Sequence, residues 1–314
     1  MACPGKAVPT RRRLTDTGTE TVRGIALVCA AYLLMALGDG AAKWTLPVVG
    51  VAGVMMGRGV FGPGTVVALA GSRRGGWRRV LATRWGLVAL RSTVHAASSV
   101  LYYAGWQLGL TLADSYAIGF STPLLMTVLA IPLLHERLRW HRAGATVVGF
   151  VGVLVMVRPG GELWNLAALV TVASIPLLAV SRILTRLLAT TETPECLAFW
   201  LLAAHLPAGL LMWAFLPISG LPGLAVVALA GLGLCQGLAH WVHARAFALA
   251  PVGALAPYEY TSLLFGGTVG WVAFAELPTR DALLGAAIVV AAGLWNLHHE
   301  QRRRRAEARS AAPP

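Results

Sequence analysis

Charged side chains are scarce in this chain. Asp, Glu, Lys and Arg together make up 12% of its 314 residues, whereas 57% of the residues are hydrophobic. An ordinary globular domain carries about a quarter charged residues, which keep its surface solvated. A soluble globular fold is therefore excluded, and a mean hydropathy of +0.68 indicates a membrane protein.

Long hydrophilic segments are also missing. Apolar runs follow one another with short loops, and a run of about 18 residues or more can cross a hydrocarbon core of about 30 Å as a helix. The first run continues to Lys43 without the short core of a secretory signal, so we interpret it as a retained span. We predict ten spans, at 24–44, 48–70, 85–107, 111–134, 143–158, 163–181, 197–216, 222–244, 251–275 and 282–299. Because only the basic tails 1–23 and 300–314 lie outside them, the function is expected within the helices.

Motifs of metal binding and catalysis are absent. The two histidines of HERLRWH, His135 and His141, lie six residues apart, whereas the zinc-protease pattern needs a spacing of four. No Ser/His/Asp set, phosphate loop or nucleotide fingerprint is present. We therefore expect no enzyme, no metal and no cofactor. The cysteines have no paired metal or redox spacing and are read as packing residues: Cys3, Cys29, Cys196 and Cys235.

Negative charge is in short supply, which leaves a net charge of +13. The basic residues gather at alternate ends of the predicted spans, at 6–23, 73–84, 137–142, 182–186, 245 and 302–309. The opposite loops hold little beyond Arg158 and Arg280. This positive-inside pattern predicts an even number of spans and two cytoplasmic termini. The tail QRRRRAEAR is interpreted as a topology signal and anionic-lipid anchor rather than a nucleic-acid site.

An internal repeat supports two halves of five spans, 24–158 and 163–299. TVLAIPLLHERLRWHRAGATVVGFVGVLVMV aligns with LLFGGTVGWVAFAELPTRDALLGAAIVVAAGLWNL, so Glu136 matches Glu276 and Gly144 matches Gly285. Since five is odd, the second half enters the membrane from the opposite side. Inverted repeats are typical of secondary transporters, whose two states arise by exchange of the conformations of the halves.

Polar side chains within the spans are the candidates for a solute site, because a polar group at membrane depth faces the protein interior or a wet cavity. Asp39 and Lys43 lie four residues apart on one helix face, either as a structural ion pair or facing the solute. Arg58 lies roughly 15 Å deep at 1.5 Å per residue. It needs a carboxylate, a carbonyl or a hydrated cavity, and Asp39 is the nearest candidate in the sequence.

Two further stripes extend this set. His95, Tyr102 and Trp106 recur at spacings of seven and four, as core residues or as a cavity lining. Ser121 stands beside Pro123, which frees a backbone carbonyl inside the membrane. In the eighth span Gln236 and His240 lie four residues apart and His243 follows, which favours a lining.

The ninth span contains a glutamate flanked by two tyrosines. Glu259 lies roughly 12 Å from the cytoplasmic end of the span, and Pro257 interrupts the same helix. Broken helices in matching spans of two halves are the best sequence indication of a solute site, and Pro123 is the approximate counterpart. Tyr258 and Tyr260 point in different directions around the helix, so we expect one of them to share the wet face with Glu259.

The chain resembles the EamA family of the drug/metabolite transporter superfamily over about residues 22–300. The resemblance rests on LGDGAAKW, on Arg58, on the run from Ser115 to RPG at 158–160, and on LAHWVHARAFALAPVGALAPYEYTSLLFGG and FAELPTRDALLGAAIVV. It implies a bacterial inner-membrane carrier with ten helices in two inverted EamA repeats. The Asp and Lys of the first span and the APxEYT-like ninth span resemble the branch with S-adenosylmethionine and riboflavin carriers. Neighbouring members export amino acids or amino-acid-derived compounds such as metallophores.

The resulting hypothesis is a secondary transporter of a small polar organic metabolite that works by alternating access, with export favoured. The alternative is an uptake carrier for riboflavin or S-adenosylmethionine, and more remote alternatives are a non-transporting scaffold or a lipid-acting enzyme. Gly233 and Gly237 permit close helix packing, either within one chain or in a homodimer. The expected solute-site residues are Asp39, Lys43, Arg58, His95, Tyr102, Trp106, Ser121, Gln236, His240, Tyr258 and Glu259.

Overall fold

Long apolar helices form the protein. The computed structural model describes residues 18–73, 75–122, 125, 126, 128, 129, 140–157, 166–216, 220–249, 255, 258 and 261–310. Every element of regular secondary structure in these ranges is a helix. The helices are α1 (Gly18–Gly71), η1 (Gly76–Val80), α2 (Trp85–Gln107), α3 (Leu112–Gly119), α5 (Trp140–Val157), α6 (Leu166–Leu188), α7 (Pro194–Ala203), α8 (His205–Phe215), α9 (Gly223–Leu249), α11 (Thr261–Phe274) and α12 (Arg280–Ser310).

Helix α1 covers both of the first two predicted spans. Its geometry is broken at Gly50, where φ is 63° and ψ is −179°. A positive φ is readily adopted only by glycine, so the break falls at Gly50 rather than in the short loop expected between 44 and 48. Residues 18–49 and 51–71 therefore form two separate arms.

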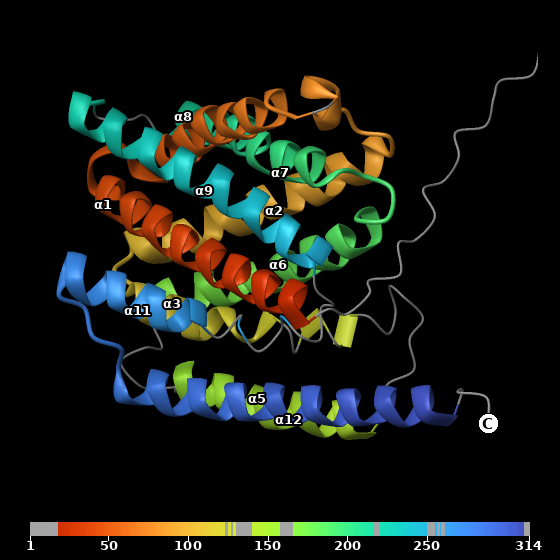
Figure 1. Cartoon of the computed structure of the whole chain (residues 1–314). Helices are drawn as coiled ribbons and strands as arrows, with labels where there is room; N and C mark the ends of the chain where they lie inside the picture. The colour runs from red at the N-terminus through yellow and green to blue at the C-terminus, as the bar shows by residue number, and fades with distance from the viewer. Residues whose placement is uncertain are drawn as a thin grey trace, which may run out of the picture.

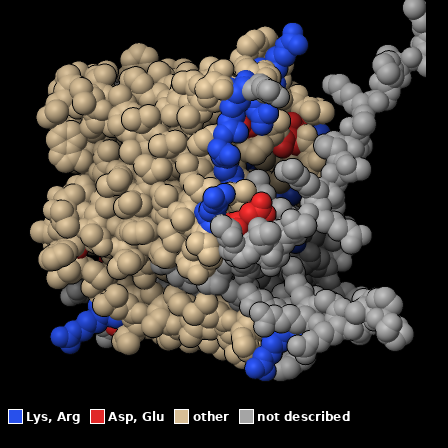
Figure 2. All heavy atoms as spheres, in the orientation of Figure 1, with Lys and Arg blue, Asp and Glu red and all other residues tan. Residues whose placement is uncertain are grey.

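The surface of the molecule is suited to lipid. Among the described residues, the stretches Val22–Gly71, Leu166–Leu188, Pro194–Phe215 and Gly223–Ala246 are long and apolar enough to cross a membrane. Large side chains such as Phe150, Leu211 and Val272 are exposed on the outside. Figure 2 shows a broad face with almost no Lys, Arg, Asp or Glu, and most of the charged side chains in this view form a band to the right of that face.

Helix α9 packs against α1, α2 packs against α6, and α5 lies beside α12 (Figure 1). Glycines make the α1–α9 contact close. A Cβ at Gly233 would meet Phe61 and Gly62, and a Cβ at Gly237 would meet Thr65 and Gly62. The small-residue face of α9 is thus used inside one chain.

Replacing Gly59 by alanine is expected to lower the free energy of unfolding by about 2 kcal/mol, because a Cβ there would overlap the backbone of Leu206 on α8. Gly64→Ala is the matched control, since a Cβ at Gly64 meets nothing within 4 Å on the same arm. Thermal unfolding of the two purified variants in detergent measures the difference. Equal melting temperatures would show that the α1–α8 crossing is looser than described.

Candidate functional site

Asp39, on the first arm of α1, is held by side chains from two other helices. Tyr116 of α3 donates its hydroxyl proton to Oδ2 at 2.7 Å, and Gln236 of α9 donates from Nε2 to Oδ1 at 2.9 Å. Gly38 permits this approach, since a Cβ there would lie 3.1 Å from Gln236 Nε2. Among the described residues, no cationic nitrogen lies within 4.0 Å of this carboxylate.

Arg58, on the second arm of α1, lies on the other side of the same glutamine. It is 6% exposed. Its Nη1 donates to the hydroxyl oxygen of Tyr103 at 2.5 Å, and its Nη2 lies 3.4 Å from Gln236 Oε1. The same Nη2 lies 3.4 Å from Nε2 of His240. Because arginine only donates, this histidine nitrogen accepts and its proton lies on Nδ1.

The amide of Gln236 therefore stands between a carboxylate and a guanidinium. The sequence indicated Asp39 as the nearest partner for Arg58, and the structure connects the two residues through this amide. Within the described part of the chain, no carboxylate lies within 4.0 Å of Arg58, and its Nε has no hydrogen-bond partner. A buried charge without a direct counter-ion is costly, so Arg58 depends on the hydrogen bonds of Tyr103, Gln236 and His240.

Three histidines lie close to Arg58. The ring of His95 on α2 is 5.6 Å from that of His205 and 6.3 Å from that of His240, between ring centroids. Nδ1 of His205 donates to the carbonyl of Leu201, so its Nε2 accepts from the hydroxyl of Ser99 at 3.1 Å. Nε2 of His95 is buried and has no hydrogen-bond partner in the described part of the chain. The described residues contain no group of three ligands placed to hold a metal ion.

The two aromatic residues of the predicted α2 stripe differ in their exposure. Trp106 is 3% exposed and its indole N–H donates to Ser115 at 2.7 Å, so it packs in the core. Tyr102 keeps some exposed surface and meets Trp106 edge-on, at 5.2 Å between ring centroids. Tyr103, Tyr116 and His205 were not among the predicted site residues, although each is a polar side chain within a predicted span.

Lys43 does not pair with Asp39. Its Nζ lies 2.6 Å and 2.7 Å from the two carboxylate oxygens of Glu276, and it also donates to the carbonyl of Leu110 at 2.9 Å. Leu112 N donates to the same glutamate at 3.2 Å. Lys43 therefore forms a structural ion pair, but with Glu276 instead of Asp39. Lys43 lies one helical turn further along α1 and reaches the loops, whereas Asp39 contacts α3 and α9.

The remaining predicted residues have partners outside this network. Ser121 donates to the carbonyl of Ile118 at 2.6 Å, one turn earlier. Tyr258 packs against the cluster formed by Val28, Tyr32 and Leu255. Glu259, which the sequence singled out, lies outside the described residues. The structure thus joins Asp39, Arg58, Gln236 and His240 by hydrogen bonds and places His95 beside them.

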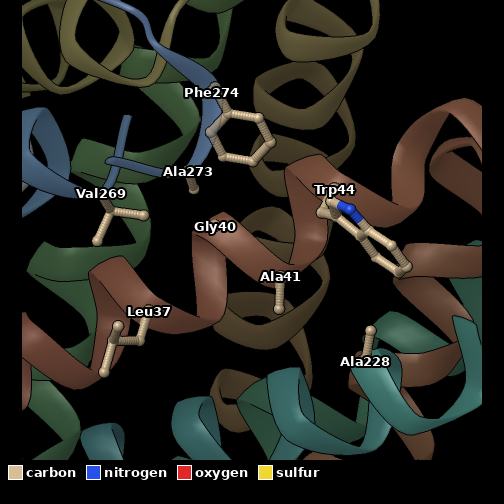
Figure 3. A pocket seen from close by; sticks show the side chains of 8 residues that line it. All are labelled: Leu37, Gly40, Ala41, Trp44, Ala228, Val269, Ala273 and Phe274. Atoms are coloured by element: carbon tan, nitrogen blue, oxygen red, sulfur yellow. The ribbon is translucent and has the colours of Figure 1, made fainter. Parts of the chain in front are cut away.

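An apolar pocket of about 320 Å³ lies between α1, α9 and α11. Figure 3 shows its lining from α1, α9 and α11: Leu37, Gly40, Ala41, Trp44, Ala228, Val269, Ala273 and Phe274. Gly40 is adjacent to Asp39 in the chain, but the lining offers almost no polar surface. The pocket therefore does not provide the hydrogen-bonding groups that a polar solute requires.

Apolar helices long enough to span a bilayer, around buried polar and charged side chains, define a multi-pass membrane protein with a polar interior. The chain is 30% identical to the riboflavin transporter of Rhizobium johnstonii over 236 residues, which cover 72% of this chain and 78% of that protein. It is 28% identical to the S-adenosylmethionine uptake transporter of Rickettsia bellii over 222 residues, 68% of this chain and 75% of that protein. The chain therefore belongs to the same family of membrane transporters as the Rhizobium protein.

Longer matches agree with this assignment. The riboflavin transporter of Brucella anthropi is 23% identical over 283 residues, 87% of this chain and 96% of that protein. A solved crystal structure superposes with a TM-score of 0.63 at 19% identity, covering 89% of this chain and 97% of the solved chain, so the fold is shared. No family model matches the sequence.

Proposed function

We propose that this protein is a secondary carrier of the EamA type that moves a small polar organic metabolite across the bacterial inner membrane by alternating access. The observation that carries the proposal is the network around Gln236, which joins Asp39 and Arg58 of α1 to α9. In transporters, the solute site lies between the two repeats near the middle of the membrane. Charged side chains that join helices of the two proposed halves, in a chain from a transporter family, are best explained as solute contacts.

The packing supports the proposed halves, 24–158 and 163–299. If the halves are equivalent, α2 corresponds to α9 and the first arm of α1 corresponds to α6. The contact of α2 with α6 then repeats the contact of α9 with α1. The pairs α5–α12 and α3–α11 each join equivalent helices, as expected about a pseudo-twofold axis.

The charge distribution supports two cytoplasmic termini. The start of α1 and the end of α12 lie at the same end of the bundle (Figure 1), which is the end where most Lys and Arg gather in Figure 2. The positive-inside rule assigns that end to the cytoplasm. An even number of spans follows from this arrangement.

The solute class follows from the relatives, which are named for riboflavin and S-adenosylmethionine. Both compounds combine a ring system with polar groups, and the network around Gln236 with Tyr102 beside it offers both kinds of contact. Export was favoured from the sequence, and uptake is the direction named for the Rickettsia relative. A carrier runs down whichever combined gradient it meets, so direction depends on the cell as well as on the protein.

Counterflow in proteoliposomes tests the proposal. Vesicles that contain the purified chain are loaded with S-adenosylmethionine, with riboflavin or with a mixture of amino acids, and labelled compound is added outside. We expect labelled solute to accumulate in at least one of the three preparations and not in protein-free vesicles. Failure in all three would contradict the proposed function. Comparative metabolomics of cells and medium, with and without the gene, then gives the direction.

A further inference from the structure

We infer that the solute carries an α-amino acid group, whose ammonium binds Asp39 and whose carboxylate binds Arg58 in place of the side-chain amide of Gln236. This inference rests on the proposed function and narrows its solute class. Of the two kinds of relative, it favours a solute of the S-adenosylmethionine kind over a flavin, because only the former carries an α-amino acid group.

The site contains two opposite charges, on Asp39 and Arg58, that are kept apart from each other. Asp39 is bound by a phenol and an amide, and Arg58 by a phenol, an amide and an imidazole. Every one of these partners is neutral when the histidine acts as an acceptor. Had the site served only for stability, a direct ion pair would have satisfied both charges at once.

The group that separates the two charges is the neutral side-chain amide of Gln236. The amide of Gln236 donates from Nε2 to Asp39 at 2.9 Å, while its Oε1 faces Arg58 at 3.4 Å. An α-amino acid presents the same order of groups, a nitrogen donor and an oxygen acceptor joined by a short carbon frame, but with full charges. Gln236 thus occupies the position of a zwitterion as a neutral stand-in.

A zwitterion is expected to bind Asp39 and Arg58 more strongly than the neutral amide does. Hydrogen bonds between charged groups are about twice as strong as those between neutral groups, so a zwitterion gains on both sides when it displaces the amide. The net charge of the α-amino acid group is zero, so the site between Asp39 and Arg58 does not acquire an excess charge. A solute with only an ammonium or only a carboxylate leaves one of the two protein charges without a counter-ion, which is costly at this depth.

The unused polar atoms agree with a carboxylate at the Arg58 side. Nε of Arg58 and Nε2 of His95 are buried and have no hydrogen-bond partner among the described residues. A carboxylate has two oxygens and about four acceptor positions, more than the single amide oxygen of Gln236 provides. The side chain of Tyr102, which is partly exposed, is available to a ring attached to the amino acid group.

The decisive experiment is competition against counterflow by the unmodified chain in proteoliposomes. S-adenosylhomocysteine keeps the ammonium and carboxylate, whereas 5′-methylthioadenosine has the same ring and thioether without them. With labelled S-adenosylmethionine or labelled amino acids as the exchanging solute, we expect S-adenosylhomocysteine to compete about tenfold more strongly. Equal competition by the two compounds overturns the inference. Exchange of riboflavin alone overturns it as well and leaves the proposed function intact, whereas no exchange of any probe defeats the proposed function itself.

The Gln236→Glu variant tests the position of the stand-in. Its carboxylate would pair with Arg58 and repel Asp39, so exchange of the zwitterion should fall about 100-fold. Gln107→Glu is the matched control, because Gln107 is an exposed glutamine at the end of α2. Melting temperatures in detergent separate misfolding from loss of binding. A folded Gln236→Glu protein that exchanges zwitterions normally overturns the inference, and the competition experiment decides the case if the variant does not fold.

Discussion

Replacing Arg58 by lysine is expected to reduce solute exchange by the reconstituted protein about 100-fold, although the charge is kept. The guanidinium contacts Tyr103, Gln236 and His240 at once through two terminal nitrogens. A lysine ammonium is a single point charge on a flexible stem and cannot reproduce this planar set of donors. Loss of one or two hydrogen bonds to a charged group, at about 1.5–3 kcal/mol each, corresponds to a change of this size.

The matched control is Arg23→Lys, at an exposed position near the start of α1. We expect this variant to exchange solute at the rate of the unmodified chain. Counterflow is measured at equal protein incorporation, and the melting temperature in detergent reports folding. Normal exchange by a folded Arg58→Lys protein would show that the solute does not contact the guanidinium, and the proposed site would be wrong.

The positions of several helices were predictable because apolar length is a local property. The segment predicted at 222–244 corresponds to α9 (Gly223–Leu249), and that at 85–107 is matched by α2 (Trp85–Gln107). The break between the first two spans was less accessible, since Pro47 lies inside the helix and Gly50 carries the change in direction. Either residue can end a helix, and tertiary packing decides between them.

The sequence indicated the polar residues that the structure joins in this network, but not how they pair. Polarity at membrane depth identified Asp39, Arg58, Gln236 and His240 without any structure. Gln236 is 197 residues from Asp39 and 178 residues from Arg58 in the chain, so no local period in the sequence connects these partners. Helical spacing placed Asp39 and Lys43 on one face, but which neighbour each meets depends on α3, α9 and the loops.

His205 illustrates the remaining gap. It is a single polar residue in the apolar segment at 197–216, and such a histidine is commonly a satisfied helix contact. Its own hydrogen bonds, to the carbonyl of Leu201 and to Ser99, fit that description. Only the position of α8 against α1 and α2 brings it next to His95 and therefore to the neighbourhood of Arg58.

Replacing Lys43 by methionine is expected to lower the free energy of unfolding by about 2–3 kcal/mol. The change leaves Glu276 without its counter-ion, and breaking a buried pair by removing one partner costs about 3–5 kcal/mol. The lower value applies because the side chains of Lys43 and Glu276 are 10% and 22% exposed. The pair also holds Leu110 and Leu112, so it ties the first arm of α1 and the loop before α3 to the segment between α11 and α12.

A double-mutant cycle tests whether this pair acts as one unit. The Lys43→Met, Glu276→Leu double variant should unfold within about 1 kcal/mol of the unmodified chain, because replacing both charges leaves no uncompensated ion. Arg280→Met is the matched control, since it removes an exposed cation at the start of α12. Thermal unfolding in detergent gives each value. If the two single losses simply add in the double variant, the ion pair does not hold α1 to the α11–α12 segment, and the packing of the apolar helices alone must connect them.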